Sequence, residues 1–200
     1  MSIENFEVVR AEPPSRLEAL AAETKNEWQQ TFDHVDDLDK PFFLTQENRH
    51  ELPPVSDETH DKLKDAGFPG DVIETIGTDA EAQIYLDADL EARTVNGKDA
   101  LIRTDIDYDQ VDPVRGETNL QRMEQGYAPL DAQGRPIELH HIGQKQDSPL
   151  AELTGSEHRG AGNDNVLHNK QKESEINRAD FDKERQEHWK ARAELIKSET

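Results

Sequence analysis

Apolar residues recur at helical spacing in several stretches of this 200-residue chain. Leu17, Leu20, Trp28 and Phe32 follow one another at roughly helical intervals, which predicts a helix over residues 16–32. Similar but shorter patterns predict helices over residues 57–66, 71–76, 78–86, 117–125 and 179–197.

Capping residues define the expected helix ends. Asp57 is the expected N-cap of the helix over residues 57–66, and Gly67 ends it. Thr78 begins the helix over residues 78–86, because the sequence Thr78-Asp79-Ala80-Glu81 resembles a helix start. Gly126 stops the helix over residues 117–125.

Two other stretches favour strands. Residues 91–105 read as a β-hairpin, because Asn96-Gly97 suits the type I′ turn, in which both central residues need a positive φ. A short strand is expected over residues 136–140, after a turn. Residues 148–159 read as strand or helix and end near a glycine-rich turn.

Two regions follow from these patterns. Residues 1–52 form an acidic N-terminal extension or linker with one helix, and residues 53–200 form the second region, with a core over 134–170. The proline-broken, acidic stretch over 33–56 motivates the boundary.

Composition narrows the classes of protein. With 32% hydrophobic and 6% aromatic residues, a core cannot fill the whole chain evenly. The absence of cysteine excludes disulfides, thiolate metal sites and a cysteine nucleophile. The N-terminal sequence does not resemble a signal peptide, and no apolar run approaches the ~18 residues of a membrane span.

The charge is strongly negative and unevenly spread. The formal net charge is −21, which argues against nucleic acid as a partner of the whole surface. However, residues 51–100 carry −9, whereas residues 135–200 carry only −2. Three interpretations remain open: acidity for solubility, a halophilic or acid-biased proteome, and a surface that docks a partner.

Histidines concentrate toward the end of the chain. His140 and His141 end a predicted strand, so their side chains are expected on opposite faces. His158 and His168 follow within 29 residues of the pair. Phosphodiester hydrolysis needs an activated water and a metal that absorbs charge, and imidazole serves both needs near neutral pH.

A longer pattern surrounds these histidines. It consists of GRPIELHHIGQ, SPLAELT, EHRGAGN and Leu167-His168. The pattern closely resembles the LHH group of the HNH/endonuclease VII superfamily, whose members are C-terminal toxin domains of bacterial polymorphic and contact-dependent toxins. The resemblance extends over about residues 57–195 and is most specific over 136–168.

The resemblance implies an α+β fold: a ββα-metal (HNH, or His-Me finger) nuclease core with additional helices and a β-hairpin. By analogy with colicin-type nucleases, His140 binds the metal and His141 is the general base. His158 matches the next metal-ligand position. His168 is the expected last ligand, with Asn163 as its rival, because the usual position holds Gly162. The expected cofactor is a divalent ion: Mg²⁺, Zn²⁺, Mn²⁺ or Ni²⁺.

One position departs from the family's pattern. The asparagine that normally orients the base aligns near Pro149, which has no side-chain donor or acceptor. Gln144, Asp147 and Asn163 are the candidates to replace it, and Gln144, three residues past His141, is favoured. Arg159 and Asn163 are the expected substrate-binding residues, since arginine can bind a phosphate bidentately.

The expected function is a metal-dependent endonuclease that acts on DNA rather than RNA, as an antibacterial toxin effector restrained by a cognate immunity protein. Such an effector is made in the bacterial cytoplasm without a signal peptide and delivered into a target cell. Two alternatives stay open: a housekeeping or phage HNH endonuclease, and a catalytically silent acidic binding protein.

Other candidates have simpler interpretations. His188 beside Trp189 favours helix packing over chemistry. The alternating Asp105, Asp107 and Asp109 favour a solvated edge or an inhibitor contact over a cation site.

Overall fold

A four-stranded sheet with helices on both faces organises the part of the chain that the computed structural model describes, namely Arg49, residues 52–160 and residues 162–199. These residues lie in one unit, Leu44–Thr200. The helix expected over 16–32 lies outside the described residues. In chain order the helices and strands are α2 (Asp57–Asp65), α3 (Gly70–Thr75), α4 (Asp79–Asp87), β1 (Glu91–Val95), β2 (Lys98–Ile102), α5 (Asn119–Glu124), β3 (Glu138–His141), the 3-10 turn η2 (Ile142–Gln144), β4 (Leu150–Leu153), α6 (Gly155–Arg159), α7 (Asn163–Leu167) and α8 (Arg178–Glu199).

The sheet is mixed, with the strand order β1-β2-β4-β3. β1 and β2 form an antiparallel hairpin whose turn residues Asn96 and Gly97 have φ of 52° and 76°, so the predicted hairpin is confirmed. β2 pairs parallel with β4, and β3 pairs antiparallel with β4. The antiparallel strands β3 and β4 lead directly into α6, which is the ββα arrangement of the expected α+β class.

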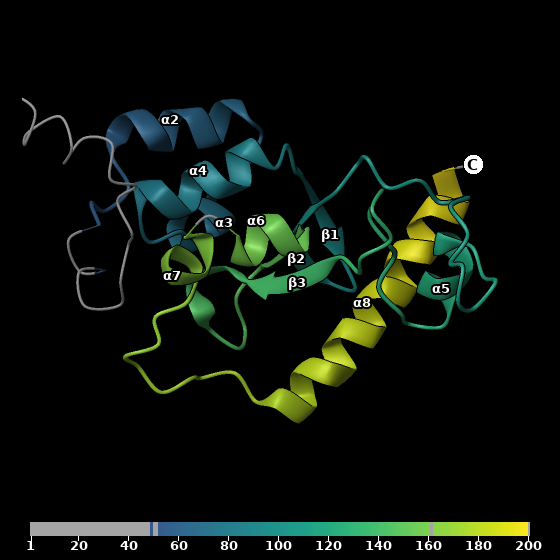
Figure 1. Cartoon of the computed structure of the whole chain (residues 1–200). Coiled ribbons are helices and arrows are strands. Elements are labelled where there is room, and N and C mark those ends of the chain that lie inside the picture. Colours follow the sequence, from purple (N-terminus) through teal and green to yellow (C-terminus); the bar gives the residue numbers. More distant parts are fainter. Residues whose placement is uncertain (1–48, 50–51, 161, 200) are drawn as a thin grey trace, which may run out of the picture. The chain divides into compact units, whose positions relative to one another are not determined.

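Strand alternation divides the core between the two faces of the sheet. Leu101 on β2 and Leu153 on β4 pack with α2, α3, α4 and α7. Ile102 on β2 and Leu150 on β4 pack with Trp189 and its neighbours on α8, and with α5. Figure 1 shows α2, α3 and α4 together on one side of the sheet, while the long helix α8 lies apart from them. Neighbouring residues of one strand therefore enter different cores.

The helix caps agree in part with those expected from the sequence. Thr78 caps α4, and its side chain accepts from the backbone N–H of Glu81. The expectation for Asp57 is wrong: Ser56 is the N-cap of α2 and accepts from the N–H of Thr59. Ser56 is a good cap residue one position upstream, and Asp57 then contributes its charge to the first helical turn.

Among the described residues, no helix combines the length and the apolar character that crossing a membrane requires.

Candidate active site

Three histidines from three elements meet beside the end of β3. His140 is the last but one residue of β3, His158 lies in α6, and His168 directly follows α7. Their potential ligand atoms all lie within 4.8 Å of one another. The ring centroids are 5.0 Å apart for His140 and His158, and 4.9 Å apart for His158 and His168. The structure thus brings together the three residues expected as metal ligands.

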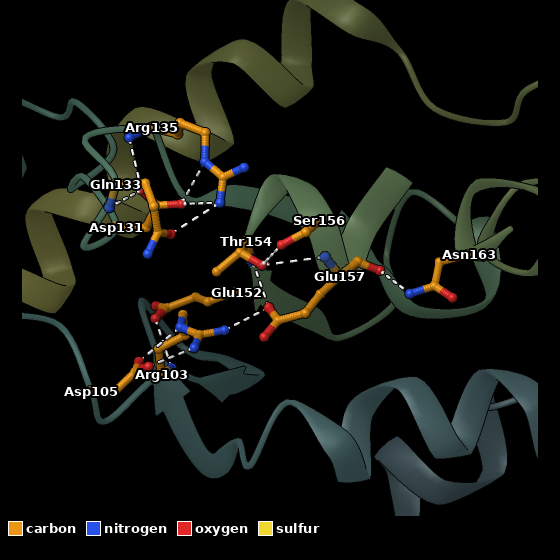
Figure 2. Close-up of polar contacts among 10 residues, drawn as sticks. All are labelled: Arg103, Asp105, Asp131, Gln133, Arg135, Glu152, Thr154, Ser156, Glu157 and Asn163. Atoms are coloured by element: carbon orange, nitrogen blue, oxygen red, sulfur yellow. Dashed lines mark hydrogen bonds and ion pairs between the residues drawn. The ribbon is translucent and has the colours of Figure 1, made fainter. Parts of the chain in front are cut away.

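A capping box fixes the helix that carries His158. The side chain of Thr154 accepts from the N–H of Glu157, and Oε2 of Glu157 accepts from the N–H of Thr154 at 2.7 Å. Arg103 then binds Glu157 at 2.6 Å, as Figure 2 shows. The ambiguous segment 148–159 is therefore a strand followed by a helix, with the boundary at Thr154.

Carboxylates orient two of the three imidazoles. Oε2 of Glu138 lies 2.5 Å from Nδ1 of His158, and Oδ1 of Asp164 lies 3.0 Å from Nδ1 of His168. An acceptor at Nδ1 selects the tautomer whose Nε2 can hold a metal. Nε2 of His158 in turn lies 3.2 Å from Nδ1 of His140.

The donor set fits a metal ion. Nε2 of His140 is buried without a hydrogen-bond partner, which leaves its lone pair available to a metal ion. Burial lowers the pKa of His140 well below its ordinary value, and the charges of His158 and His168 act in the same direction. Burial also lowers the pKa of His158, although the hydrogen bond that Glu138 accepts from the ring opposes this shift. Both rings are therefore neutral near pH 7, which is the form that binds metals.

His141 faces the opposite side of β3. Its ring centroid lies 4.5 Å from that of Phe181 on α8, and Nε2 lies 2.9 Å from Oε2 of Glu184. Lys98 on β2 binds the other carboxylate oxygen of Glu184 at 2.5 Å. Burial lowers the pKa of His141, although the charge of Glu184 opposes that shift.

Gln144 lies in the turn after the histidine pair. Its side-chain oxygen accepts from the N–H of Asn169 at 2.7 Å, next to His168. In the described part of the chain, the side chain within hydrogen-bonding distance of His141 is that of Glu184. The turn needs Gly143, because a Cβ there would lie 2.7 Å from the carbonyl oxygen of Thr75 and φ is 70°.

The two expected substrate-binding residues already contact protein groups. Arg159 is largely exposed, and its Nε donates to Glu138 at 3.0 Å. Nδ2 of Asn163 donates to the main-chain oxygen of Glu157 at 2.8 Å, a contact drawn in Figure 2. Arg159 therefore has an exposed side chain near the triad, whereas Asn163 fastens the start of α7 to α6.

His188 and the acidic residues fit their simpler interpretations. His188 is buried, and its Nε2 lies 2.8 Å from the fully buried Glu152. Arg192 binds the same carboxylate at 2.9 Å, so this cluster joins α8 to β4. Asp105 pairs with Arg103 at 2.6 Å.

Two carboxylates of the site were not singled out from the sequence. Glu138 lies two residues before His140, and strand alternation places both on one face, so a signal for it was present. Glu184 carries no such local signal, since it is 43 residues from His141.

One cleft of about 1420 Å³ is lined by the four histidines His140, His141, His158 and His168. The lining of this cleft in the described residues is nearly balanced in charge, in a chain of net charge −21. Its basic residues are Arg49, Lys145, Arg159, Lys170, Lys172, Arg178 and Arg185. Its acidic residues are Glu81, Glu138, Asp164, Glu173, Glu175 and Asp182. The cleft is thus a part of the surface that a polyanion can approach.

Comparison with known families gives a match over residues 118–195, to the family LHH, described as a nuclease of the HNH/ENDO VII superfamily with conserved LHH. The match contains β3, β4, α6 and α7 and most of α8, and the LHH sequence is Leu139-His140-His141. No solved structure matches the chain.

Proposed function

We propose that the chain is a metal-dependent endonuclease that cleaves DNA, since residues 118–195 match the family LHH, a nuclease of the HNH/ENDO VII superfamily. The observation that carries this proposal is the pairing of two environments at one strand end. Three imidazoles, those of His140, His158 and His168, meet on one face of β3, and a fourth, that of His141, lies on the next residue. Hydrolysis of a phosphodiester needs a metal site and a base in such a fixed relation.

His140, His158 and His168 would hold the ion. Imidazole ligands favour Zn²⁺, Ni²⁺ or a similar transition metal over Mg²⁺, which prefers oxygen ligands. When bound, the ion would polarise the phosphate and stabilise charge on the leaving oxygen. Glu138 and Asp164 keep the ligand rings in the required tautomers.

His141 is the proposed base. A neutral imidazole has one N–H, and on His141 we assign it to Nε2, which donates to the Glu184 carboxylate at 2.9 Å. The other ring nitrogen is then the one that accepts the proton from water. Glu184, paired with Lys98, is a positioning residue that fixes the tautomer and orientation of the ring.

Gln144 has a different part in this proposal from the one expected of it. It fastens Asn169, and thereby the chain next to His168, to the turn after the base. Arg159 and the other basic residues of the cleft would hold the phosphate backbone.

The cellular role is a further part of this proposal, and it rests on the resemblance of the sequence to LHH toxin domains. We propose an antibacterial effector delivered into a target cell and restrained at home by an immunity protein. The strongly acidic stretch over 51–100 offers a docking surface to such an inhibitor, which would carry a complementary basic patch. A housekeeping or phage nuclease with the same site remains the second candidate, and growth of a naive bacterium that expresses the protein distinguishes the two.

Plasmid cleavage tests the activity. Purified protein, stripped with a chelator and reloaded with Zn²⁺, Ni²⁺, Mn²⁺ or Mg²⁺, is compared with His141→Ala and with a control, His60→Ala, on α2. We expect metal-dependent nicking by wild type and the control, and none by His141→Ala. Equal cleavage by His141→Ala would overturn the assignment of the base.

A further inference from the structure

Arg49 contacts the helix that precedes the last histidine of the triad. Its Nε donates to the main-chain oxygen of Asn165 at 3.0 Å, and its Nη2 donates to that of Val166 at 2.7 Å. These carbonyls belong to the last turn of α7, and His168 is the first residue after the helix. Arg49 lies upstream of residues 118–195, so it is not part of the matched family segment.

The chemistry of both partners suits this contact. Carbonyl groups in the last turn of a helix have no intrahelical donors, and a cation there is favourable. The guanidinium presents two N–H groups in a rigid fork, so it can bind two successive carbonyls at once. A two-point contact fixes the rotation of α7, which a single hydrogen bond would leave freer.

Packing also fixes α7. Leu167 is 1% exposed and belongs to the core on this face of the sheet, whereas the ring of His168 is only partly buried. The N–H of His168 bonds to Asp164 O at 3.0 Å. Arg49 and Leu167 therefore hold α7 between them, and His168 leaves the helix in a direction set by both.

A buried carboxylate holds the turn that follows the histidine pair. Glu81 accepts from the N–H of Gly143 at 3.2 Å and from that of Gly77 at 2.9 Å. Burial raises the pKa of Glu81, and the charge of Arg49 opposes this rise.

We infer that Arg49 is a positioning residue of the metal site, which holds α7 so that His168 completes the triad with His140 and His158. The inference rests on the proposed function, since it assumes that these histidines bind an ion. It extends the site to a residue far upstream of the family match, and it gives the segment around residue 49 a part in metal affinity.

Calorimetric titration of the full-length protein with Zn²⁺ tests this role. We expect Arg49→Ala to weaken Zn²⁺ binding about tenfold, the lower end for a partner that orients a ligand. The Zn²⁺ affinity of Arg49→Lys should lie between those of wild type and Arg49→Ala, because lysine keeps the charge but not the two-point contact. The control is Arg93→Ala on β1, which removes an exposed arginine paired with Glu91.

A double-mutant cycle shows whether the effect passes through His168. In the His168→Ala background, Arg49→Ala should cause little further loss of affinity. Zn²⁺ affinity of Arg49→Ala within twofold of wild type, or an equal tenfold loss in both backgrounds, would overturn the inference.

Hydrogen exchange separates this inference from the proposed function. Arg49→Ala should speed exchange at the N–H of His168 while the core strands keep their protection. Unchanged exchange at His168 overturns the inference even if the nuclease is active. If wild type binds no Zn²⁺, the metal role of Arg49 and the metal-dependent function both fail, whereas tight binding by wild type and Arg49→Ala alike refutes Arg49 alone.

Discussion

The two faces of β3 give adjacent histidines different surroundings. On one face His140 meets two further imidazoles, and the carboxylates Glu138 and Asp164 contact the outer nitrogens of those rings. On the other face His141 meets a carboxylate directly, that of Glu184, and no second imidazole among the described residues lies against it. The strand pleat is what allows one dipeptide to serve two kinds of chemistry.

The two faces also differ in how far apart in the sequence the residues that build them lie. The three ligands and the two carboxylates that contact them all lie within residues 138–168. The base face joins β3 to β2 through Lys98 and to α8 through Glu184. Changes in α8 should therefore reach the base without disturbing the ligands, and the predictions below use that difference.

The largest effect is expected from removal of the base itself. His141→Ala should lower the rate of plasmid cleavage by about 10²–10⁴-fold, the usual contribution of a general base. The rate is measured by single-turnover cleavage with saturating Zn²⁺. A loss of less than about tenfold, with the control His60→Ala at the wild-type rate, would contradict the role of His141.

The next effect concerns the stability of the base face. Glu152 is fully buried between His188 and Arg192, so Glu152→Ala leaves buried donors without their acceptor. Loss of one partner of a buried ion pair costs about 3–5 kcal/mol, which urea unfolding measures. Glu194→Ala on α8, an exposed acid, is the control. An equal free energy of unfolding in both variants would show that this cluster does not hold α8.

The same cluster predicts a pH dependence. Burial raises the pKa of Glu152, but the hydrogen bond with His188 and the charge of Arg192 outweigh it, so the net pKa is lowered from 4.5. The carboxylate thus stabilises the fold fully above about pH 4.5, and this stability is lost as the pH falls through the lower folded-state pKa. Wild type should lose stability more steeply than Glu152→Gln below pH 4.5; parallel curves would contradict the shift.

Glu184 should matter less than His141 but act on the same step. Glu184→Ala is expected to lower kcat about tenfold, with KM and the Zn²⁺ affinity near wild type, because positioning of the base affects the chemical step. Glu184→Gln should recover part of the loss, and Glu187→Ala on the same helix is the control. A raised kcat in Glu184→Ala would mean that the carboxylate blocks the base.

The sequence predicts the ligand face better than the base face, and the reason is physical. The Asn96-Gly97 hairpin, the strand over 136–140 and the alternation of His140 and His141 depend on local conformational preferences. The contact between Glu184 and His141 depends on how α8 packs on the sheet, which no local pattern encodes. Likewise Ser56 rather than Asp57 caps α2, because two adjacent residues both suit the position and the geometry of the preceding turn selects one.

The smallest effect is expected at the domain boundary. We predict that a chain beginning near Leu52 folds and cuts DNA, and Arg49 provides a way to sharpen this prediction. We expect a chain over 44–200 to bind Zn²⁺ like the full protein, and one over 52–200 to fold but bind it several-fold more weakly, because it lacks Arg49. Calorimetry and circular dichroism compare the two; equal affinities would place the boundary at residue 52.

The central claim is that His140 and His141 divide metal binding and base catalysis between the two faces of β3. Calorimetric titration of His140→Ala and His141→Ala with Zn²⁺ tests it most directly. The account predicts that His140→Ala loses at least about tenfold in affinity, while His141→Ala binds Zn²⁺ like wild type and yet does not cut DNA. Equally tight binding by both variants, or loss of Zn²⁺ binding in His141→Ala, would contradict it.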